Sequence, residues 1–374
     1  MSSVPIREDG PATGASSIPR RSGELALAAV AAATLTSLYA LQTGILVRAA
    51  ALREGAHGAW LEAAIWLVVL TALALFFPAA RSLGFWQSKK RALGSNDVVS
   101  ARICAAAARN WAFISLGYAA AGILALGFVN FVLANDMAVG RTFFYLPLIA
   151  EKYHLVVYAF WNNIFIFVIA EILVLVWGLV VAIGRLLPGE AGRPIRMLAA
   201  LYCDVFRGLP AVVTLYLIGF GLPLSGIVPS EIPGIGKVPL TWYAIIALTL
   251  TYGAYVAEVY RAGIESIHWS QIAAARSLGL SYVQALRYVI VPQAVRRIMA
   301  PLLNDFIGLQ KDTALVNVIG VIDGFNQSRI IASNAFNLSA VTIVAILFVL
   351  ITIPQARFVD KLLERDQRRM RAQG

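Results

Sequence analysis

The sequence predicts an all-α membrane protein with about eight transmembrane helices. Of its 374 residues, 59% are hydrophobic and 14% are charged, whereas an ordinary soluble domain has about 25% charged residues. The mean hydropathy is +0.75, and the apolar residues gather in long runs. This composition excludes a disordered chain, a disulfide-stabilised scaffold and an ordinary soluble enzyme.

The apolar runs define the predicted transmembrane spans. A hydrocarbon core about 30 Å thick requires roughly 20 apolar residues of helix. Eight stretches approach this length, and the fifth and seventh are the weakest because they contain charged residues. The predicted spans are 25–47, 60–77, 111–134, 161–184, 203–222, 240–260, 298–320 and 338–354.

Lysine and arginine are distributed unevenly between the predicted loops. With the N-terminus placed in the cytoplasm, the cytoplasmic segments hold 24 of the 31 basic residues and the external loops hold 6. Cytoplasmic loops of membrane proteins carry such an excess, so we expect a multi-pass protein of the cell membrane with both termini in the cytoplasm. The net charge of +11 then requires no nucleic-acid partner. The clusters Lys89-Lys90-Arg91 and Arg368-Arg369 are interpreted as topology signals beside anionic lipid.

The composition changes near residue 160. The segment before this point is expected to hold a disordered cytoplasmic tail and three alanine-rich spans with a basic cytoplasmic loop. The segment after it holds Gly-Pro punctuation, intramembrane charges and one long cytoplasmic loop, and the chain after Pro354 is expected to form a short amphipathic helix. The predicted divisions are 1–24 (tail), 25–160 (extra spans), 161–360 (core) and 361–374 (charged cytoplasmic tail).

The predicted cytoplasmic loop 261–297 is too long for a simple turn, and much of it favours helix. Residues 271–278 are predicted to form a helix that ends at Gly279, a residue free to adopt a positive φ. Ser281 is placed to cap a second helix, which is expected to run until Pro292 interrupts it. The loop is therefore expected to be a helix–turn–helix, either a docking element or a plain connection between two spans.

The run from Ala273 to Pro292 resembles the EAA signature, E-A-A-x3-G-x9-I-x-L-P, of ABC importer permeases. The spacing matches in full, with conservative replacements at Val289 and Val291, whereas Ala273 stands where the family usually has Glu. In that family this loop docks into a groove on the ATPase subunit. The resemblance implies a coupling role for Ala273, Ala274, Ala275, Arg276, Gly279 and Pro292.

Three further blocks resemble the polar amino acid permeases of this group, those for histidine, glutamine, arginine and glutamate. Residues 206–210 (FRGLP) resemble the family's FRGTP, residues 257–264 (AEVYRAGI) resemble AEIFRGGI, and residues 311–320 (KDTALVNVIG) resemble KDTSL-x-SVIG. The resemblance covers about 161–360. It implies a five-helix core of the type I importer permease fold, a second permease subunit that is identical or different, two ATPase subunits, an external substrate-binding protein and an amino acid substrate.

Charged residues inside predicted spans are expensive and usually face a bundle interior or a cavity. Lys311 and Asp312 are adjacent, so they point about 100° apart along a helix and need not pair with each other. They either flank the translocation path or subunit interface, or belong to a buried structural network in which each has a partner. The candidates for the path or interface are Glu171, Arg207, Glu258, Lys311, Asp312 and Thr313.

Other intramembrane charges have possible partners close in sequence. Glu258 and Arg261 are three residues apart near the end of the sixth span, and this spacing favours an ion pair on one helix face. Asp204 and Arg207 have the same spacing and are expected to pair in the same way. Glu171 has no evident partner, and it either faces a pore or makes a hydrogen bond to a neighbouring helix.

The sequence contains no pattern typical of an enzyme. The phosphate-binding pattern G-x4-G-K-[ST] is absent, so ATP hydrolysis is expected on a separate partner subunit. Catalytic Ser-His-Asp or Cys-His sets and metal-ligand spacings are also absent, and neither a cofactor nor a metal is expected. The alternative function is a stand-alone secondary transporter or a membrane sensor, although the repeat symmetry of many secondary transporters is not evident.

Overall fold

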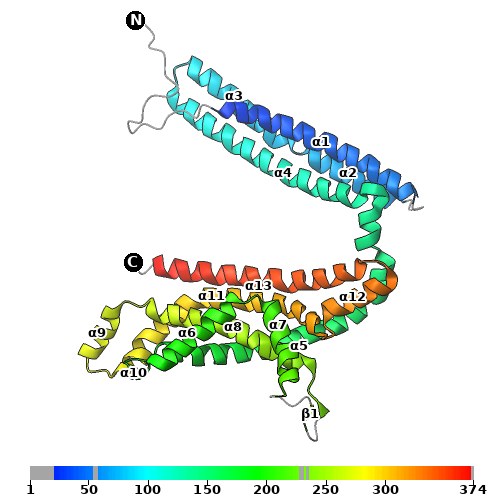
Figure 1. Cartoon of the computed structure of the whole chain (residues 1–374). Coiled ribbons are helices and arrows are strands. Elements are labelled where there is room, and N and C mark those ends of the chain that lie inside the picture. The colour runs from blue at the N-terminus through cyan, green and yellow to red at the C-terminus, as the bar shows by residue number, and fades with distance from the viewer. Residues whose placement is uncertain (1–20, 54–57, 227–230, 233–235, 372–374) are drawn as a thin grey trace. The chain divides into compact units, whose positions relative to one another are not determined.

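A computed structural model describes residues 21–53, 58–226, 231–232 and 236–371 of the chain. These residues form helices joined by short connections, together with one antiparallel pair of two-residue strands, β1 (Glu231–Ile232) and β2 (Gly236–Lys237). The chain divides into two compact units, Met1–Thr142 and Phe143–Gly374. The predicted all-α class is confirmed (Figure 1).

The first unit is a group of long helices held together by small side chains. Its elements are α1 (Ser22–Arg53), α2 (Ala59–Leu73), α3 (Phe76–Gly94) and α4 (Val98–Phe143), with α1 running alongside α2 and α3 (Figure 1). Ala29, Ala33, Ala79 and Ala112 form one of its buried clusters. Small residues let helix backbones approach closely, which is how helices associate within lipid.

The last part of α4 departs from helical geometry. Residues 134–137 have non-helical backbone angles, and Asn135, Asp136 and Met137 have positive φ. Asp136 forms an ion pair with Arg53 at the end of α1, with 2.8 Å between Oδ1 and Nη1. The third predicted span, 111–134, therefore ends at this break.

The second unit is built around the pairing of two long helices. Its elements are α5 (Leu146–Arg185), α6 (Arg193–Gly208), α7 (Ala211–Ser225), α8 (Leu240–Glu265), α9 (Trp269–Ser277), α10 (Tyr282–Ala285), the π-helix η1 (Leu286–Ile290), α11 (Val291–Asp312), the 3-10 helix η2 (Thr313–Ile319), α12 (Gly324–Ala335) and α13 (Ser339–Arg371). The main core places Ile166 and Val174 of α5 with Leu248 and Val256 of α8. At Gly178 an added Cβ would lie 2.7 Å from Val256, so the close contact of α5 with α8 requires glycine there.

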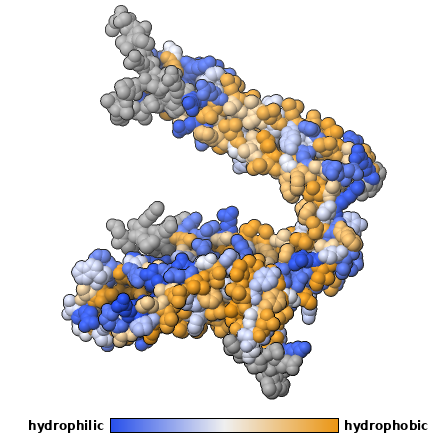
Figure 2. Space-filling model, in the orientation of Figure 1, coloured by the Kyte–Doolittle hydropathy of each residue, from blue (hydrophilic) through white to orange (hydrophobic). Residues whose placement is uncertain are grey.

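Most of the predicted spans coincide with helices that can cross a membrane. Five helical stretches among the described residues are long and apolar enough, or six if the bent pair α6 and α7 counts as one span. One stretch, Val98–Arg185, contains both α4 and α5 and so includes two predicted spans. Hydrophobic residues cover much of the visible face of each unit (Figure 2). The count of eight is thus approximate.

The fifth predicted span, 203–222, is not one helix. α6 and α7 meet at a bend of 108°. Leu209 at the bend has extended backbone angles, φ −88° and ψ 134°, because the ring of Pro210 disfavours helical geometry in the preceding residue. The prediction of a continuous span across this point was wrong.

The seventh predicted span, 298–320, is also divided. α11 ends at Asp312, η2 follows, and Gly320 ends η2 with φ +90°. Lys311 and Asp312 therefore lie at the end of α11, whereas the sequence placed them near the middle of a continuous span. The polar composition of α11 leaves it outside the set of stretches that are apolar enough to cross a membrane.

The predicted ends of the domains also differ from the structure. The expected boundary near residue 160 falls inside α5, and the compact units divide at residues 142 and 143. α13 continues through Pro354 to Arg371 as one helix, so the chain after Pro354 is not a separate short helix. Residues 1–20 of the predicted N-terminal tail lie outside the described residues, and α1 begins at Ser22.

Candidate coupling loop and intramembrane polar centre

The long loop between α8 and α11 begins with a capped helix. α8 ends at Glu265, and His268 is the N-cap residue of α9. The Nδ1 atom of His268 accepts a hydrogen bond from the backbone N–H of Ser270 at 3.3 Å. Such a bond satisfies one of the amide groups that a helix leaves unpaired at its first turn. The start of α9 is therefore defined by its own sequence.

α9 ends in a Schellman turn. The backbone N–H of Leu280 donates to the carbonyl of Ala275 at 3.2 Å, and the N–H of Gly279 donates to the carbonyl of Arg276 at 3.0 Å. Gly279 has φ +84°, a left-handed conformation that costs a residue with a Cβ atom roughly 1–2 kcal/mol. The prediction that Gly279 ends the first helix with a positive φ is confirmed.

The second helix of the loop begins with a capping box. The Ser281 hydroxyl accepts a hydrogen bond from the backbone N–H of Gln284 at 3.3 Å, and the Gln284 side chain accepts one from the backbone N–H of Ser281 at 2.8 Å. The two residues therefore satisfy each other's unpaired amide groups. The prediction that Ser281 caps the second helix is confirmed.

The second helix does not stop at Pro292. α10 continues into the π-helix η1, and α11 follows directly with Pro292 in its first turn. A proline ring clashes with the carbonyl of the preceding helical turn, and the wider π turn gives it more room. The prediction of an interruption was wrong, because a π turn replaces the break.

An apolar cluster holds the loop against the unit. Ile267, Ile290 and Ala294 are buried together. At Gly263 of α8 an added Cβ would lie 2.0 Å from Ile298 of α11, so the two helices that carry the loop touch at this glycine. The loop is thus anchored at both ends.

The outer surface of the loop is largely exposed. Of the predicted coupling residues, Ala273, Ala274, Arg276 and Gly279 are exposed, whereas Ala275 is buried. The loop also exposes large apolar side chains that sequence reasoning missed. Their exposed fractions are 72% for Trp269, 84% for Leu278 and 69% for Val283. The signal that could have identified them was their place beside Gly279 and the two caps.

A single carboxylate joins three helices near the loop. Glu258 of α8 forms ion pairs with Arg261 of the same helix and with Arg185 at the end of α5. Arg207 of α6 is also within reach, with 4.0 Å between Nη1 and Oε2. The side chain of Glu258 is only 21% exposed. The expected pair of Glu258 and Arg261 is confirmed, and Arg185 was missed because it lies 73 residues away.

The expected pair of Asp204 and Arg207 is not present. The guanidinium of Arg207 faces Glu258 instead, and it lies 5.7 Å from the centre of the Tyr255 ring. No ion pair joins Asp204 to Arg207 among the described residues. Glu258 is partly buried and Asp204 is exposed, so water screens the attraction of Arg207 to Glu258 less than an attraction to Asp204.

Asp312 and Lys311 have different surroundings at the end of α11. The Tyr252 hydroxyl of α8 donates a hydrogen bond to Oδ2 of Asp312 at 2.9 Å. Lys311 is exposed, and within the described part of the chain it has no ion-pair partner. The two charges do not pair with each other, as expected, but the prediction that each has a partner holds only for Asp312.

Thr313 belongs to a buried polar network that joins α5, η2 and α12. The side-chain amide of Asn163 donates to the Thr313 hydroxyl at 3.2 Å and to Oδ2 of Asp323 at 2.9 Å. The carbonyl of the same amide accepts from the backbone N–H of Gly324 at 2.9 Å. Asp323 in turn caps α12 by accepting from the N–H of Asn326 at 2.9 Å. Asn163, Thr313 and Asp323 are all buried, so the network is fully internal.

Asn163 and Thr313 also border a small cavity of about 150 Å³. Gln310, which is 6% exposed, contributes to its wall, and its Oε1 atom has no hydrogen-bond partner in the described structure. Phe160 and Phe348 provide part of the apolar wall. The polar network thus faces an internal space of limited size.

Glu171 lies on α5, half-buried, near a second carboxylate. Asp305 of α11 is close enough to interact with it electrostatically. Among the described residues Glu171 makes no hydrogen bond, so the interhelical hydrogen bond considered for it is not present. One oxygen of Asp305, Oδ2, is buried without a partner.

Metal-binding and redox groups do not gather in the described residues. No group of three His, Cys, Asp or Glu side chains there could hold a metal ion. Cys104 and Cys203 are both free thiols. The arrangement is therefore one of ion pairs, capped helices and hydrogen bonds between helices, which is suited to conformational coupling and passage of a polar solute.

Comparison with known proteins identifies the chain as the membrane component of a transport system. The family of binding-protein-dependent transport system inner membrane components matches residues 175–371, over half of the chain. The chain belongs to this family. The predictions of a transport subunit and of an ABC importer permease fold are thereby confirmed.

Individual relatives match about half of this chain, and the match covers most of their own length. The probable amino-acid permease protein YxeN of Bacillus subtilis (strain 168) is 35% identical over 204 residues, which cover 54% of this chain and 87% of YxeN. The arginine transport system permease protein ArtQ of the same organism is 32% identical over 200 residues, which cover 54% of this chain and 86% of ArtQ. A crystal structure of an amino acid ABC transporter with histidines is 31% identical, with a TM-score of 0.50, and covers 59% of this chain and 95% of that chain.

Proposed function

We propose that this chain is a permease subunit of an ATP-driven ABC importer and carries polar amino acids across the cell membrane. Support comes from the family match together with the names of the relatives, which include an amino-acid permease and an arginine permease. The solved relative is an amino acid ABC transporter with histidines.

The observation that carries the proposal is the construction of the loop 261–297. A Schellman turn at Gly279 and a capping box at Ser281 make a rigid tip, and Leu278 and Val283 expose apolar surface beside it. Trp269 exposes apolar surface at the other end of α9. Exposed apolar groups on a capped, anchored helix pair are suited to a groove on a partner protein. We assign the docking of an ATPase subunit to this tip, with Ala273, Ala274, Arg276 and Gly279 on the contact surface. Ala275, which is buried, and Pro292, which is exposed in the first turn of α11, maintain its shape.

The proposed assembly has further partners. A second permease subunit, identical or different, completes the pathway, two ATPase subunits bind the two coupling loops, and an external binding protein delivers the amino acid. Closure of the ATPase subunits on ATP brings the loops together and favours the outward-facing state, and hydrolysis resets it. ATP changes the populations only to the extent that the ATPases bind it differently in the two states.

The polar centre is proposed to line the route of the substrate. Asp312 and Thr313 border the end of α11, Lys311 is exposed beside them, and Glu171 lies near Asp305. Charged side chains at such positions usually face a cavity or the bundle interior. Arg207 and Glu258 are assigned a structural role, since they tie α5, α6 and α8 together beneath the loop.

The first unit is proposed to be an additional membrane module. It lies outside the family match, which begins at residue 175. In this proposal residues 1–24 and 361–374 are cytoplasmic, and the excess of basic residues in the predicted cytoplasmic loops supports that orientation.

Uptake by the reconstituted importer tests the proposed transport function. The chain is assembled in liposomes with its ATPase and binding protein, and uptake of labelled histidine, glutamine, arginine and glutamate is measured with and without internal ATP. We expect ATP-dependent accumulation of at least one of them. Accumulation driven by an ion gradient without ATP would contradict the proposal and support a secondary transporter.

Cysteine labelling of intact cells tests the proposed orientation. In a background without Cys104 and Cys203, a membrane-impermeant thiol reagent is expected to modify Tyr145→Cys and to spare Lys90→Cys and Leu280→Cys. Permeabilised cells provide the control, because all three positions should then react. Labelling of position 90 from outside would contradict the cytoplasmic placement of the basic loop.

A further inference from the structure

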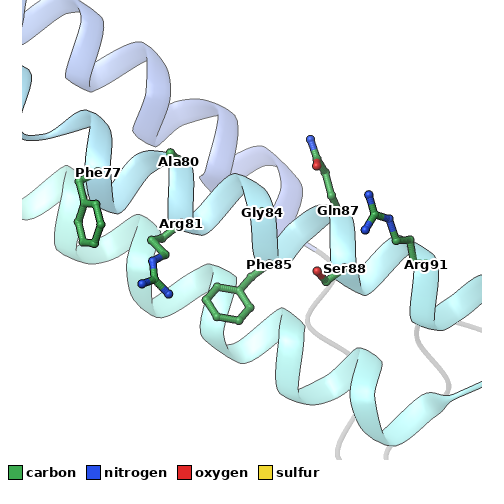
Figure 3. A pocket seen from close by; sticks show the side chains of 8 residues that line it. All are labelled: Phe77, Ala80, Arg81, Gly84, Phe85, Gln87, Ser88 and Arg91. Carbon is green, nitrogen blue, oxygen red and sulfur yellow. The ribbon is translucent and has the colours of Figure 1, made fainter.

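One face of α3 in the first unit carries a groove that the transport function does not use. Its volume is about 500 Å³, and it is lined by Phe77, Ala80, Arg81, Gly84, Phe85, Gln87, Ser88 and Arg91. Figure 3 shows these side chains along the helix, with Phe77, Arg81 and Phe85 in succession and Arg91 further toward its C-terminal end. The lining thus changes from apolar to polar along the helix.

The length of the helix sets the depth of this groove in the membrane. Ala59–Gly94 is a helical stretch of 36 residues, which corresponds to about 54 Å, whereas the hydrocarbon core is about 30 Å thick. Within this stretch, residues 59–80 contain no Lys or Arg, and Arg81 follows directly. The apolar end of the groove therefore lies at acyl-chain depth, and its polar end lies at the level of the lipid headgroups.

Arg81 is held in place at this boundary. Its guanidinium lies 5.4 Å from the centre of the Phe77 ring and 5.8 Å from the ring of Trp111 on α4. Contacts of this kind orient the planar cation without neutralising it. Neither Arg81 nor Arg91 has a carboxylate partner among the described residues. The two groups remain available for an anion.

We infer that this groove binds an anionic glycerophospholipid. The phosphate pairs with the guanidinium group of Arg91, and the Ser88 hydroxyl and the Gln87 amide donate to the headgroup oxygens. Arg81 lies ten residues, about 15 Å, earlier on the helix and attracts the anionic headgroup from beside the acyl chain, which follows Ala80 and Phe77. Arginine pairs with phosphate through two parallel hydrogen bonds. A basic pocket at the end of a membrane-spanning helix is suited to an anionic lipid headgroup. The apolar end of the groove makes a lipid, rather than free phosphate, the matching ligand.

Native mass spectrometry of the full-length chain, purified in detergent with the subunits that accompany it, tests the inference. Phosphatidylglycerol and phosphatidylcholine are added at equal concentration, and the lipid-bound fraction is measured. We expect phosphatidylglycerol to be retained preferentially. Arg91→Gln should lower its retention about fivefold, and Arg81→Gln should lower it by a smaller factor.

Matched variants separate a specific groove from general attraction to positive charge. Lys90→Gln removes a neighbouring cation outside the lining and should change retention by less than about twofold. Gly84→Leu fills the groove without changing charge. No atom lies within 4 Å of an added Cβ at Gly84 or at the control position Gly117 of α4, and leucine is the better helix former. Gly84→Leu should lower retention, and Gly117→Leu should not.

Several outcomes would overturn the inference. They are equal retention of the two lipids, an effect of Lys90→Gln as large as that of Arg91→Gln, and full retention in Gly84→Leu. Glycerol phosphate bound as tightly as phosphatidylglycerol would also overturn it, because the apolar end of the groove would then contribute nothing.

Discussion

Two helix turns, one in each unit, share the same backbone construction. In the turn between α3 and α4, the N–H of Asp97 donates to the carbonyl of Ala92 at 2.9 Å around Asn96, which has φ +58°. In the turn between α9 and α10, the N–H of Leu280 donates to the carbonyl of Ala275 at 3.2 Å around Gly279. Both are Schellman turns. The backbone alone therefore does not distinguish a coupling loop from a connection.

The helices that follow the two turns are also capped alike. Asp97 accepts a hydrogen bond from the N–H of Ser100 at 3.0 Å, and Ser281 accepts one from the N–H of Gln284 at 3.3 Å. The difference lies in what the turns expose. The turn at Gly279 presents the large apolar side chain of Leu278, 84% exposed, whereas the turn at Asn96 is flanked by the basic end of α3. If the turn at Gly279 docks a partner as proposed, the comparison teaches that side-chain chemistry, on a common backbone, makes the difference between the two turns.

The largest effect is expected at Gly279. Gly279→Asp adds strain in a left-handed residue and places a charge in the proposed contact, where an unpaired charge costs about 2–5 kcal/mol. ATP-driven uptake should fall at least about tenfold while the protein reaches the membrane in normal amounts. Asn96→Asp changes the corresponding residue of the other turn and should leave uptake unchanged.

Two further variants separate the effect of backbone strain from that of charge, one at Gly279 and one at Ala273. Gly279→Asn has the shape of the aspartate variant, tolerates left-handed geometry and is neutral, so it should retain more uptake. Ala273→Glu adds a carboxylate at an exposed residue and restores the residue usual in the family, so it should be tolerated. Equal losses of ATP-driven uptake in Gly279→Asp and Asn96→Asp would show that the two turns do not differ in function.

A moderate effect on stability is expected at Glu258. Glu258→Gln leaves the partly buried Arg185 and Arg261 without their carboxylate, which should destabilise the fold by about 2 kcal/mol after allowance for solvent screening. The melting temperature of the purified protein should fall by several degrees. The first unit offers a control in Glu62→Gln, which removes the ion pair with Arg48. The side chains of Arg48 and Glu62 are 63% and 42% exposed, so this change should lower the melting temperature by about one degree or less. Equal shifts would show that the network does not hold the second unit together.

The smallest effect is expected at Asp312. Asp312→Asn keeps the hydrogen bond from Tyr252 and removes the charge, so uptake should fall about threefold while membrane levels stay normal. A threefold change corresponds to less than about 1 kcal/mol. Asp312→Leu removes both and should also lower the folded amount. Asn130→Leu in the first unit removes a partly buried hydrogen bond to the Thr43 hydroxyl, 2.7 Å long, and should affect the folded amount but not uptake per molecule. Full uptake by Asp312→Asn would assign Asp312 a structural role.

The loop was predictable because its signals are local. The helix end at Gly279 and the cap at Ser281 depend on residues within a few positions of each other, and the pair of Glu258 and Arg261 lies within one helical turn. The bend between α6 and α7 was also visible locally, since Pro210 restricts Leu209. Hydropathy averaged over a window overlooked it, because the residues on both sides of the bend are apolar.

The polar centre was largely beyond prediction because its partners are distant in sequence. The hydrogen bonds from Asn163 reach Thr313 and Asp323, which are 150 and 160 residues away. The Tyr252 partner of Asp312 is 60 residues away. Charge alone drew attention to Asp312, whereas Asn163 and Tyr252 carry no charge and resemble ordinary residues of a helix.

The π turn before Pro292 sets the angle, about the helix axis, between the exposed side of α10 and that of α11. The buried residues Ala285, Ile290, Ala294 and Ile298 are spaced by five, four and four positions, and the step of five coincides with the wider turn. The extra residue thus keeps the buried side chains on one face from α10 through η1 to α11, so these elements form one continuous helix. One residue removed from this turn would rotate the exposed side of α10 by about 100° relative to α11. The length of this segment, and not only its composition, therefore sets the direction in which the proposed docking surface faces.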